Sequence, residues 1–202
     1  MFDLKSIRIL PPDEAAMRAA AARQDTLAKP PHSLGRLEEI AIRFAGITGK
    51  VLNSAKKRRV LAFCADNGVT KEGVASAPQS VTLAQTINFT RGLTGCAVLC
   101  RHFGAELVPY DVGINAVFAQ NGVIDRKIAL GTKNIAREPA MTRAQAMQAM
   151  EAGFEAAAQA KADGVEFSAL EKWASATRPP PRRCCRVCCV CPRRRPSGAA
   201  AA

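Results

Sequence analysis

Two acidic turns are the part of the sequence whose residue types and spacing best suit chemistry. Asp66-Asn67-Gly68 and Asp111-Val112-Gly113 each follow a short run of mainly apolar residues. If these runs are parallel strands, the turns lie at the carboxyl edge of one sheet, where ligands bind in α/β proteins. A carboxylate beside a glycine turn could hold a polar substrate there. Asp, Asn and Gly also favour ordinary turns, which on spacing alone is the stronger interpretation.

A second candidate is the glycine pair in residues 90–95, Thr-Arg-Gly-Leu-Thr-Gly. These residues lie within or beside a predicted helix, where each glycine costs about 1 kcal/mol relative to alanine. We therefore expect the glycines to let the helix backbone pack closely on the sheet. The sequence has neither a GxGxxG motif nor a P-loop lysine, so the pattern does not indicate a dinucleotide or a nucleoside triphosphate.

Histidine and cysteine give no metal site. His32 and His102 are the only histidines, and neither has a second ligand at metal-binding spacing. Cys185-Arg-Val-Cys188 lacks the second ligand pair of a zinc site and lies between arginines and prolines. We expect no metal, no redox site and no cofactor. Three dispersed cysteines are expected to be reduced, buried thiols: Cys64, Cys96 and Cys100.

The overall composition is that of a soluble enzyme. Hydrophobic residues make up 48% and aromatic residues 5% of the 202, so the core must be aliphatic and rich in alanine. No apolar run approaches the roughly 18 residues of a membrane span. The first residues do not have the layout of a secretory signal. We therefore expect a cytoplasmic protein that does not interact with membranes.

The net charge of +12 is unevenly distributed. Residues 168–202 hold eight basic residues and one acid, a net charge of +7, while residues 1–167 hold 21 basic and 16 acidic residues, a net charge of +5. An excess of +5 is ordinary for a soluble enzyme. The charge therefore argues against a nucleic-acid partner for residues 1–167.

Two helices are predicted near the N-terminus. The first is expected over residues 12–28, where Pro11 and Pro12 open the helix and residues 15–27 are strong helix formers. Residues 29–35 break the helix with two further prolines. A second helix is expected over residues 36–49, with Ser33 placed to cap it. Its apolar side chains share one face: Leu37, Ile40, Ala41, Phe44 and Ile47.

A strand–helix–strand unit follows. Residues 59–64 are a continuous apolar run, typical of a strand covered on both faces. One helix is predicted over residues 80–103, ended by Gly104, and a second strand over residues 106–112. This order predicts parallel strands in an α/β fold, a Rossmann-like parallel sheet with flanking helices.

The rest of the chain divides sharply in character. Residues 115–140 resemble a loop, residues 142–163 a helix capped by Thr142, and residues 164–167 the start of a third strand. After that the composition changes to Pro, Arg and Cys. We therefore divide the chain into an N-terminal helical segment, residues 1–55, a partial α/β domain, residues 56–167, and a disordered tail, residues 168–202. In this interpretation the sheet is truncated after its early strands.

Eight stretches of the chain form a series with a characteristic order and spacing. They are Lys29-Pro-Pro-His-Ser-Leu-Gly-Arg-Leu-Glu38, Ala65-Asp-Asn-Gly-Val69, Glu72-Gly-Val-Ala75, Pro78 with Val81-Thr82 and Gln85, Thr90-Arg-Gly-Leu-Thr-Gly95, Asp111-Val-Gly-Ile114, Gly131-Thr-Lys-Asn-Ile135 and Pro139-Ala-Met-Thr142. Together they resemble the nicotinate-nucleotide–dimethylbenzimidazole phosphoribosyltransferases over residues 1–167, roughly the first half of that family's chain. Two residues depart from the family pattern. His32 stands where the family usually has glycine, and Ala77 where some members have a serine that contacts the base.

The resemblance implies the reaction and part of the site. Such enzymes transfer the phosphoribosyl group of nicotinate mononucleotide to 5,6-dimethylbenzimidazole, giving α-ribazole 5′-phosphate and nicotinate for the lower ligand of cobalamin. The family is homodimeric. Its general base is a glutamate near the C-terminus, outside residues 1–167, so no catalytic residue is assigned in this chain. The substrate-binding candidates, by the resemblance and the strand-end rule, are Gln85, Pro78, Ala77, Asp66, Asn67 and Asp111.

The tail is interpreted as the same gene read in a shifted frame. When the first two bases of each codon from Glu171 to Pro179 are joined to the third base of the codon before, they can spell Gly-Glu-Met-Gly-Ile-Gly-Asn-Thr-Thr. The family has this phosphate-binding stretch at this point. A genuine Pro/Arg-rich disordered extension is the alternative.

Three functions follow for comparison. The first is the family's pentosyltransferase reaction. The second is a catalytically inactive, truncated fragment of that enzyme. For the chain as its sequence stands, we favour this second function over the first. The third is a basic, Cys-rich nucleic-acid or zinc-binding module made by the tail. Because a sheet cut after its early strands leaves an uncovered edge, we also expect poor folding or aggregation of the chain expressed alone.

Overall fold

The computed structural model describes residues 8–176 of the 202-residue chain. Most of the segment predicted to be a disordered tail, including the whole Cys185–Cys188 motif, therefore lies outside the described residues. In chain order the elements are α1 (Glu14–Asp25), α2 (Arg36–Thr48), β1 (Arg58–Ala65), the short 3-10 helix η2 (Gly68–Glu72), α3 (Ser80–Thr90), α4 (Gly95–His102), β2 (Ala105–Gly113), β3 (Ile124–Asp125), α5 (Arg143–Ala162) and β4 (Phe167–Ala174).

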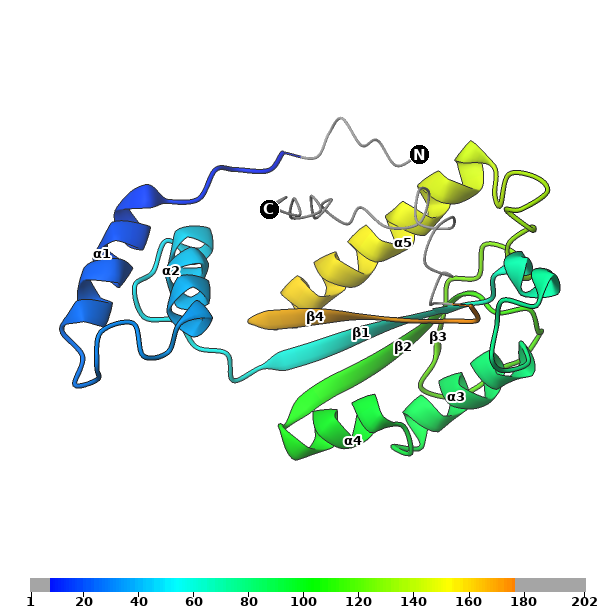
Figure 1. The fold of residues 1–202 in the computed structure, drawn as a ribbon, viewed down its shortest axis with the longest axis horizontal. Helices are drawn as coiled ribbons and strands as arrows, with labels where there is room; N and C mark the ends of the chain where they lie inside the picture. The colour runs from blue at the N-terminus through cyan, green and yellow to red at the C-terminus, as the bar shows by residue number, and fades with distance from the viewer. Residues whose placement is uncertain (1–7, 177–202) are drawn as a thin grey trace, which may run out of the picture.

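The strands form one parallel sheet in the order β3-β2-β1-β4. Strand β1 pairs with β2 from Arg58↔Ala105 onward and with β4 from Arg58↔Phe167 onward. Helices α3 and α4 cover one face of the sheet and α5 covers the other (Figure 1). The predicted α/β fold with a parallel sheet and flanking helices is confirmed.

The crossover between β1 and β2 contains two helices, so the prediction of one helix over residues 80–103 is wrong. Gly92 adopts a φ of +73° after the end of α3, and the Thr94 side chain caps α4 by accepting a hydrogen bond from the Ala97 amide at 3.1 Å. A Cβ at Gly95 would meet nothing within 4 Å. The glycines therefore lie at the break between two helices. Close packing of a helix on the sheet is not the reason for them.

Helix α5 begins as the sequence predicts. Thr142 and Gln145 form a reciprocal capping box, which satisfies backbone groups that a helix start leaves unpaired. Ala152, Ala156 and Ala160 are buried at a spacing of four residues and form a flat face against the sheet. These buried alanines agree with the expectation of a core that is aliphatic and rich in alanine. Within residues 8–176 no helix is both long and apolar enough to cross a membrane.

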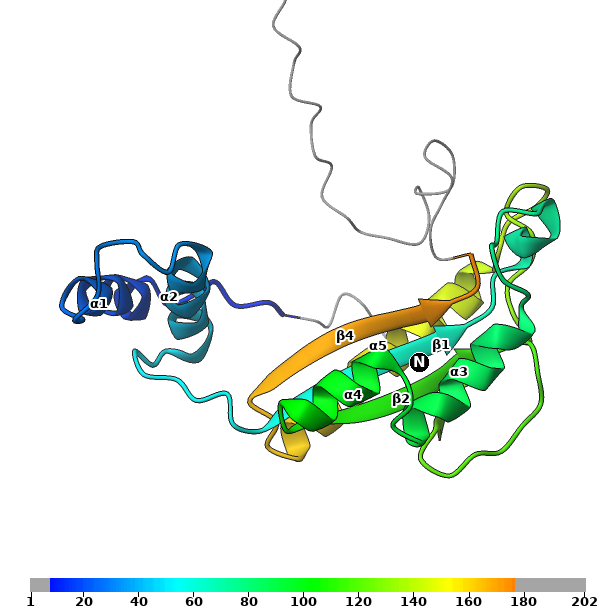
Figure 2. The ribbon, with the colours of Figure 1, turned by 60° about the horizontal axis from the view of Figure 1, so that its bottom comes forward.

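The helices α1 and α2 pack against each other beside the amino-terminal ends of β1 and β4 (Figure 2). Ser33 does not cap α2. Instead the Glu38 carboxylate accepts hydrogen bonds from the Leu34 amide at 3.1 Å and the Lys29 ammonium at 2.8 Å, which joins the two ends of the Lys29–Glu38 motif.

The apolar face predicted for α2 is largely exposed in the described structure. Leu37, Ile40 and Ile47 are 64%, 53% and 76% exposed. Helix α1 instead contacts the small residues of α2, since a Cβ at Gly46 would lie 2.7 Å from the Met17 Sδ. The side chain of Phe44 reaches the sheet, where its ring meets Phe167 edge-on at 6.4 Å.

Strand β4 runs seven residues past the expected boundary at residue 167. Its pairing with β1 continues to Ala65↔Ala174. Residues 168–174 are therefore part of the sheet and not of a disordered tail, because they keep strand-forming residues such as Leu170 and Trp173 before the prolines begin.

The three cysteines of the described chain are free, with Cys64 and Cys100 buried and Cys96 half-buried. Burial raises the pKa of the Cys64 thiol to about 11.

Candidate functional site

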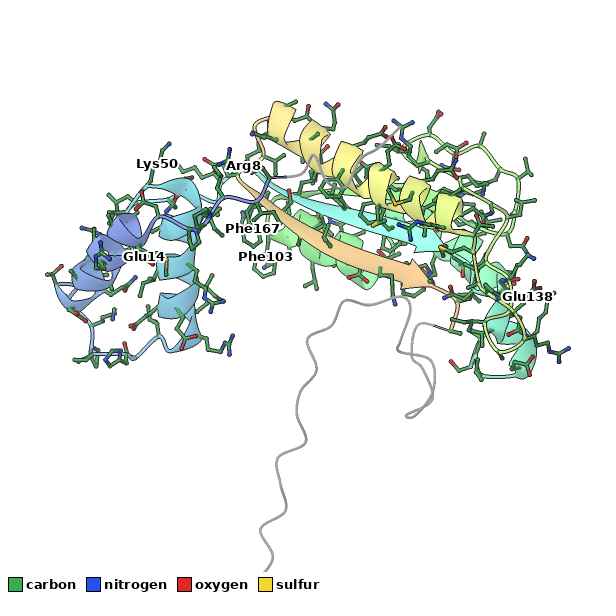
Figure 3. All side chains as sticks on the ribbon, turned by 90° about the horizontal axis from the view of Figure 1, so that it is seen from above. Arg8, Glu14, Lys50, Phe103, Glu138 and Phe167 are labelled. Carbon is green, nitrogen blue, oxygen red and sulfur yellow. The ribbon has the colours of Figure 1, made fainter. Side chains whose placement is uncertain are left out.

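The carboxyl ends of β1 and β2 bring the two acidic turns to one edge of the sheet. This is the end at which Glu138 lies, opposite the end marked by Phe167 (Figure 3). The Asp111 carboxylate accepts hydrogen bonds from the Gly113 and Ile114 amides at 3.1 and 2.9 Å and pairs with the Lys127 ammonium at 2.6 Å. In the described structure Asp111 therefore orders its own turn and the loop that follows.

Asp66 holds the same loop from the neighbouring strand. Its Oδ2 accepts a hydrogen bond from the Asn115 amide at 2.9 Å, and its backbone oxygen accepts one from the Thr132 amide at 2.9 Å. The residue is 2% exposed, and its Oδ1 accepts no hydrogen bond from the described residues. A buried carboxylate oxygen without a partner is costly, so this atom remains available to a hydrogen-bond donor.

The turn after Asp66 is fixed by close contact with a distant loop. A Cβ at Gly68 would lie 2.6 Å from the Lys133 carbonyl carbon, so only glycine fits there. Beyond it, the Glu72 carboxylate accepts hydrogen bonds from the Asn134 amide group at 2.6 Å and the Arg137 guanidinium at 2.9 Å. These bonds lower the pKa of Glu72, and they tie residues 68–72 to residues 131–138.

A cavity of about 270 Å³ opens on the α3 face of this edge, which we call the β4 cavity. Its lining comes from the loop before α3, from the first turn of α3 and from the end of β4. The lining residues are Val74, Ala75, Ser76, Ala77, Pro78, Val81, Thr82, Trp173, Ala174, Ser175 and Ala176. None of them carries a charge.

The end of β4 is anchored over this cavity by Asn67. The Asn67 backbone amide donates to the Ser175 Oγ at 2.9 Å, and the Asn67 side-chain amide donates to the Ser175 carbonyl oxygen at 2.8 Å. Two residues earlier, the Trp173 ring meets the buried Phe89 ring edge-on, with centroids 6.1 Å apart. The wall made by β4 is thus held both by hydrogen bonds and by ring packing.

A second cavity of about 280 Å³ lies on the α5 face. It is lined by the ends of β1 and β2, the loop at residues 128–133 and the first turns of α5, and its lining includes Val112, Thr132 and Gln145. Its one charged lining residue is Lys133, whose ammonium pairs with Glu138 at 2.7 Å. Several lining residues belong to stretches that carry the family resemblance, among them Gly113, Thr132 and Met141, but none of the candidate substrate-binding residues lines this cavity.

The structure brings together only some of the candidate residues. Ala77 and Pro78 line the β4 cavity, and Asn67 holds its wall through Ser175. Gln85 is half-buried on α3 but is not among the lining residues, and neither Asp66 nor Asp111 is. Their roles toward a substrate stay predictions. Trp173 and Ser175 were missed because they fall in the segment assigned to the tail.

The lining of the β4 cavity limits its chemistry. It has apolar walls and the hydroxyl groups of Ser76, Thr82 and Ser175, but no carboxylate, imidazole, amine or thiol. A general base must lie within hydrogen-bond reach of the proton that it removes. The described cavity is therefore suited to bind a flat neutral molecule, and these lining residues supply no group that would remove its proton.

Comparison with known proteins adds independent information. The family model for phosphoribosyltransferases named DBI_PRT matches residues 9–171. A nicotinate-nucleotide–dimethylbenzimidazole phosphoribosyltransferase of Clostridium perfringens is 52% identical over 155 residues, which are 77% of this chain and 43% of that protein. A protein of the same name from Ruminiclostridium cellulolyticum is 49% identical over 151 residues, 75% of this chain and 43% of that protein.

The fold comparison points the same way. The crystal structure of a nicotinate-nucleotide–dimethylbenzimidazole phosphoribosyltransferase from Thermus thermophilus superposes with a TM-score of 0.76 at 36% identity. The match covers 81% of this chain and 50% of that one. The chain spans about half the length of the curated relatives that it matches.

Proposed function

The chain belongs to the phosphoribosyltransferase family DBI_PRT, and from this premise we propose that it carries the acceptor-base site of a nicotinate-nucleotide–dimethylbenzimidazole phosphoribosyltransferase. In that reaction the bond between the ribose anomeric carbon and the nicotinate nitrogen breaks. A new bond forms to a ring nitrogen of 5,6-dimethylbenzimidazole, which loses a proton. The products are nicotinate and α-ribazole 5′-phosphate.

The uncharged lining of the β4 cavity is the observation that carries this proposal. Dimethylbenzimidazole is flat and has no fixed charge, so it loses little hydration in a cavity with apolar walls. Nicotinate mononucleotide carries a phosphate, which needs cations or clustered backbone amides. The cavity therefore favours the acceptor base over the phosphoribosyl donor.

We also propose that this chain does not complete the transfer on its own. The family's general base, by the resemblance, is a glutamate near the C-terminus, and the chain spans about half the length of its relatives. The cavity lining contains no group that could replace that base. For the intact enzyme the proposal is a cytoplasmic homodimer with two small-molecule substrates and no cofactor, metal, nucleic-acid or membrane partner.

The sequence near residue 167 and beyond is proposed to be read in a shifted frame. The family match ends at residue 171, close to the expected shift. Ala176 supports the proposal from the backbone, because its φ of +53° lies in the left-handed region that glycine adopts freely, and the shifted frame gives glycine at this position. Sequencing the gene across codons 160 to 180 tests this. The proposal fails if no single-base shift restores Gly-Glu-Met there.

The function is tested by separating base binding from turnover. Equilibrium dialysis of the full chain against 5,6-dimethylbenzimidazole should show binding of the base. Incubation with both substrates, followed by chromatography for α-ribazole 5′-phosphate, should show none above background. The full-length Clostridium perfringens relative, assayed in parallel, is the positive control. Turnover by this chain would contradict the assignment as an inactive half, and absence of base binding would contradict the assignment of the β4 cavity.

A further inference from the structure

We infer that Trp173 is a specificity-determining residue of the β4 cavity, which gives this chain its own aromatic wall for the ring of the acceptor base. The inference rests on the proposed function and goes beyond it, because Trp173 lies outside residues 9–171 that match the family. It is also the only tryptophan of the chain.

The sheet places the Trp173 side chain where it meets both the core and the cavity. Parallel pairing with β1 sets Trp173 beside Cys64, which is fully buried. The tryptophan packs on the core cluster of Ala62, Cys64, Phe89 and Ile114. Its edge-on contact with Phe89, at an interplanar angle of 85°, fixes the plane of the indole. A ring that is held on one side and lines a cavity on the other is preorganised for a ligand.

The residue two positions after Trp173 anchors the end of β4 at the cavity. Ser175 is bonded twice to Asn67 at the end of β1, at 2.9 and 2.8 Å. The rest of the lining includes Ala77 and Pro78 in the loop before α3 and Val81 on α3. The ligand space therefore lies between an aromatic ring and small apolar side chains, which fits a flat bicyclic ring better than a flexible or branched molecule.

The chemistry of the walls defines the ligand class. An indole attracts another aromatic ring by offset stacking or edge-to-face contact. Because the lining is uncharged, the favoured ligand is a neutral aromatic heterocycle, and the side-chain polar groups of the lining are the hydroxyl groups of Ser76, Thr82 and Ser175. Benzimidazoles belong to this class. Nicotinate, which is an anion, does not.

The test measures binding of 5,6-dimethylbenzimidazole to the full chain by equilibrium dialysis at dilute protein. Trp173→Ala should bind the base about tenfold more weakly, because it removes both the stacking contact and the apolar area of the ring. Trp173→Phe, which keeps an aromatic wall, should bind within about threefold of the unchanged chain. The matched control is Leu170→Ala on the same strand, which is 75% exposed and does not line the cavity. Its affinity should not change.

A second measurement needs no variant and guards against misfolding. The emission of the single tryptophan should change as the unmodified chain is titrated with the base, and it should not change with nicotinate. If the unmodified chain does not bind the base, the proposed function fails. If it binds the base without an emission change and Trp173→Ala binds equally well, the role of Trp173 is overturned while the proposed function stands.

Discussion

At the scale of single residues, two backbone conformations carry the most information. In residues 8–176 only His32 and Ala176 combine a side chain with a left-handed φ, at +59° and +53°. This region costs an L-residue about 1–2 kcal/mol. His32 stands where the family usually has glycine, and Ala176 stands where the shifted frame supplies it. The agreement of two separate positions supports both the family alignment and the frame proposal.

Glycine at either position should therefore stabilise the chain. His32→Gly and Ala176→Gly remove the left-handed strain at the cost of greater freedom in the unfolded state, so each should raise the free energy of unfolding by about 0.5–1 kcal/mol. Urea denaturation measures the change. Ala55→Gly is the control, since Ala55 is exposed and has no positive φ. It should be neutral or destabilising, and an equal gain there would remove the strain argument.

Arg59 is a buried cation whose two partners come from different elements. It is 8% exposed and donates to Glu106 on β2 at 2.7 Å and to Asp163 at the end of α5 at 2.6 Å. Arg59→Met should lower the free energy of unfolding by about 2 kcal/mol, because both charge-assisted bonds are lost. Arg18→Met is the matched control, since the Arg18–Glu14 pair is highly exposed. It should change stability by less than about 0.5 kcal/mol.

At the scale of elements, the sequence predicted those with strong local signals. The helix predicted over residues 142–163 agrees with α5, because its capping box and its alanine spacing are both local. The split between α3 and α4 was missed because the prediction placed the residues that mark it, the left-handed Gly92 and the capping residue Thr94, within one helix. The full length of β4 was missed as well. Its partner β1 lies about a hundred residues earlier, and composition alone does not reveal this pairing.

The N-terminal helices should give the chain a dependence on pH. The hydrogen bond from Lys29 lowers the pKa of Glu38 below its usual 4.5. A depressed folded-state pKa means that this stabilisation is fully present above pH 4.5 and is lost as the pH falls through the folded-state value. The melting temperature should therefore fall between pH 5 and pH 3.

Removing the cation tests this assignment. Lys29→Met should lower the melting temperature at pH 6, because Glu38 then keeps its charge in a buried position with only the Leu34 amide and the more distant His32 beside it. It should also make the fall below pH 4.5 shallower. Thermal melts followed by circular dichroism across this range measure both effects. A slope identical to that of the unchanged chain would assign the acid sensitivity to other carboxylates, such as Asp163, whose pKa the hydrogen bond from Arg59 lowers.

At the scale of the whole molecule, the site could be predicted only in part. The strand-end rule selected the edge at which the β4 cavity opens, and the resemblance selected Ala77 and Pro78, which line that cavity. The cavity itself joins three segments, residues 74–78, 81–82 and 173–176, and no local pattern links them. Residues 173–176 were left out of the predicted site because the boundary of the tail was set at residue 167, ahead of the segment rich in Pro, Arg and Cys. A break in sequence character is therefore not a break in structure here.

The uncovered edge of β4 leads to the last prediction, that the chain self-associates. In the described sheet β4 pairs with β1 only, and its Phe167 and Leu170 are 47% and 75% exposed. An unpaired edge strand with apolar side chains invites pairing with another chain, which a charge on the edge opposes. Light scattering at rising concentration should therefore increase for the unchanged chain and increase less for Leu170→Lys. Val117→Lys adds the same charge to a loop residue that is 89% exposed, away from the edge, and should leave the scattering unchanged. If both variants reduce scattering equally, net charge and not the β4 edge controls association.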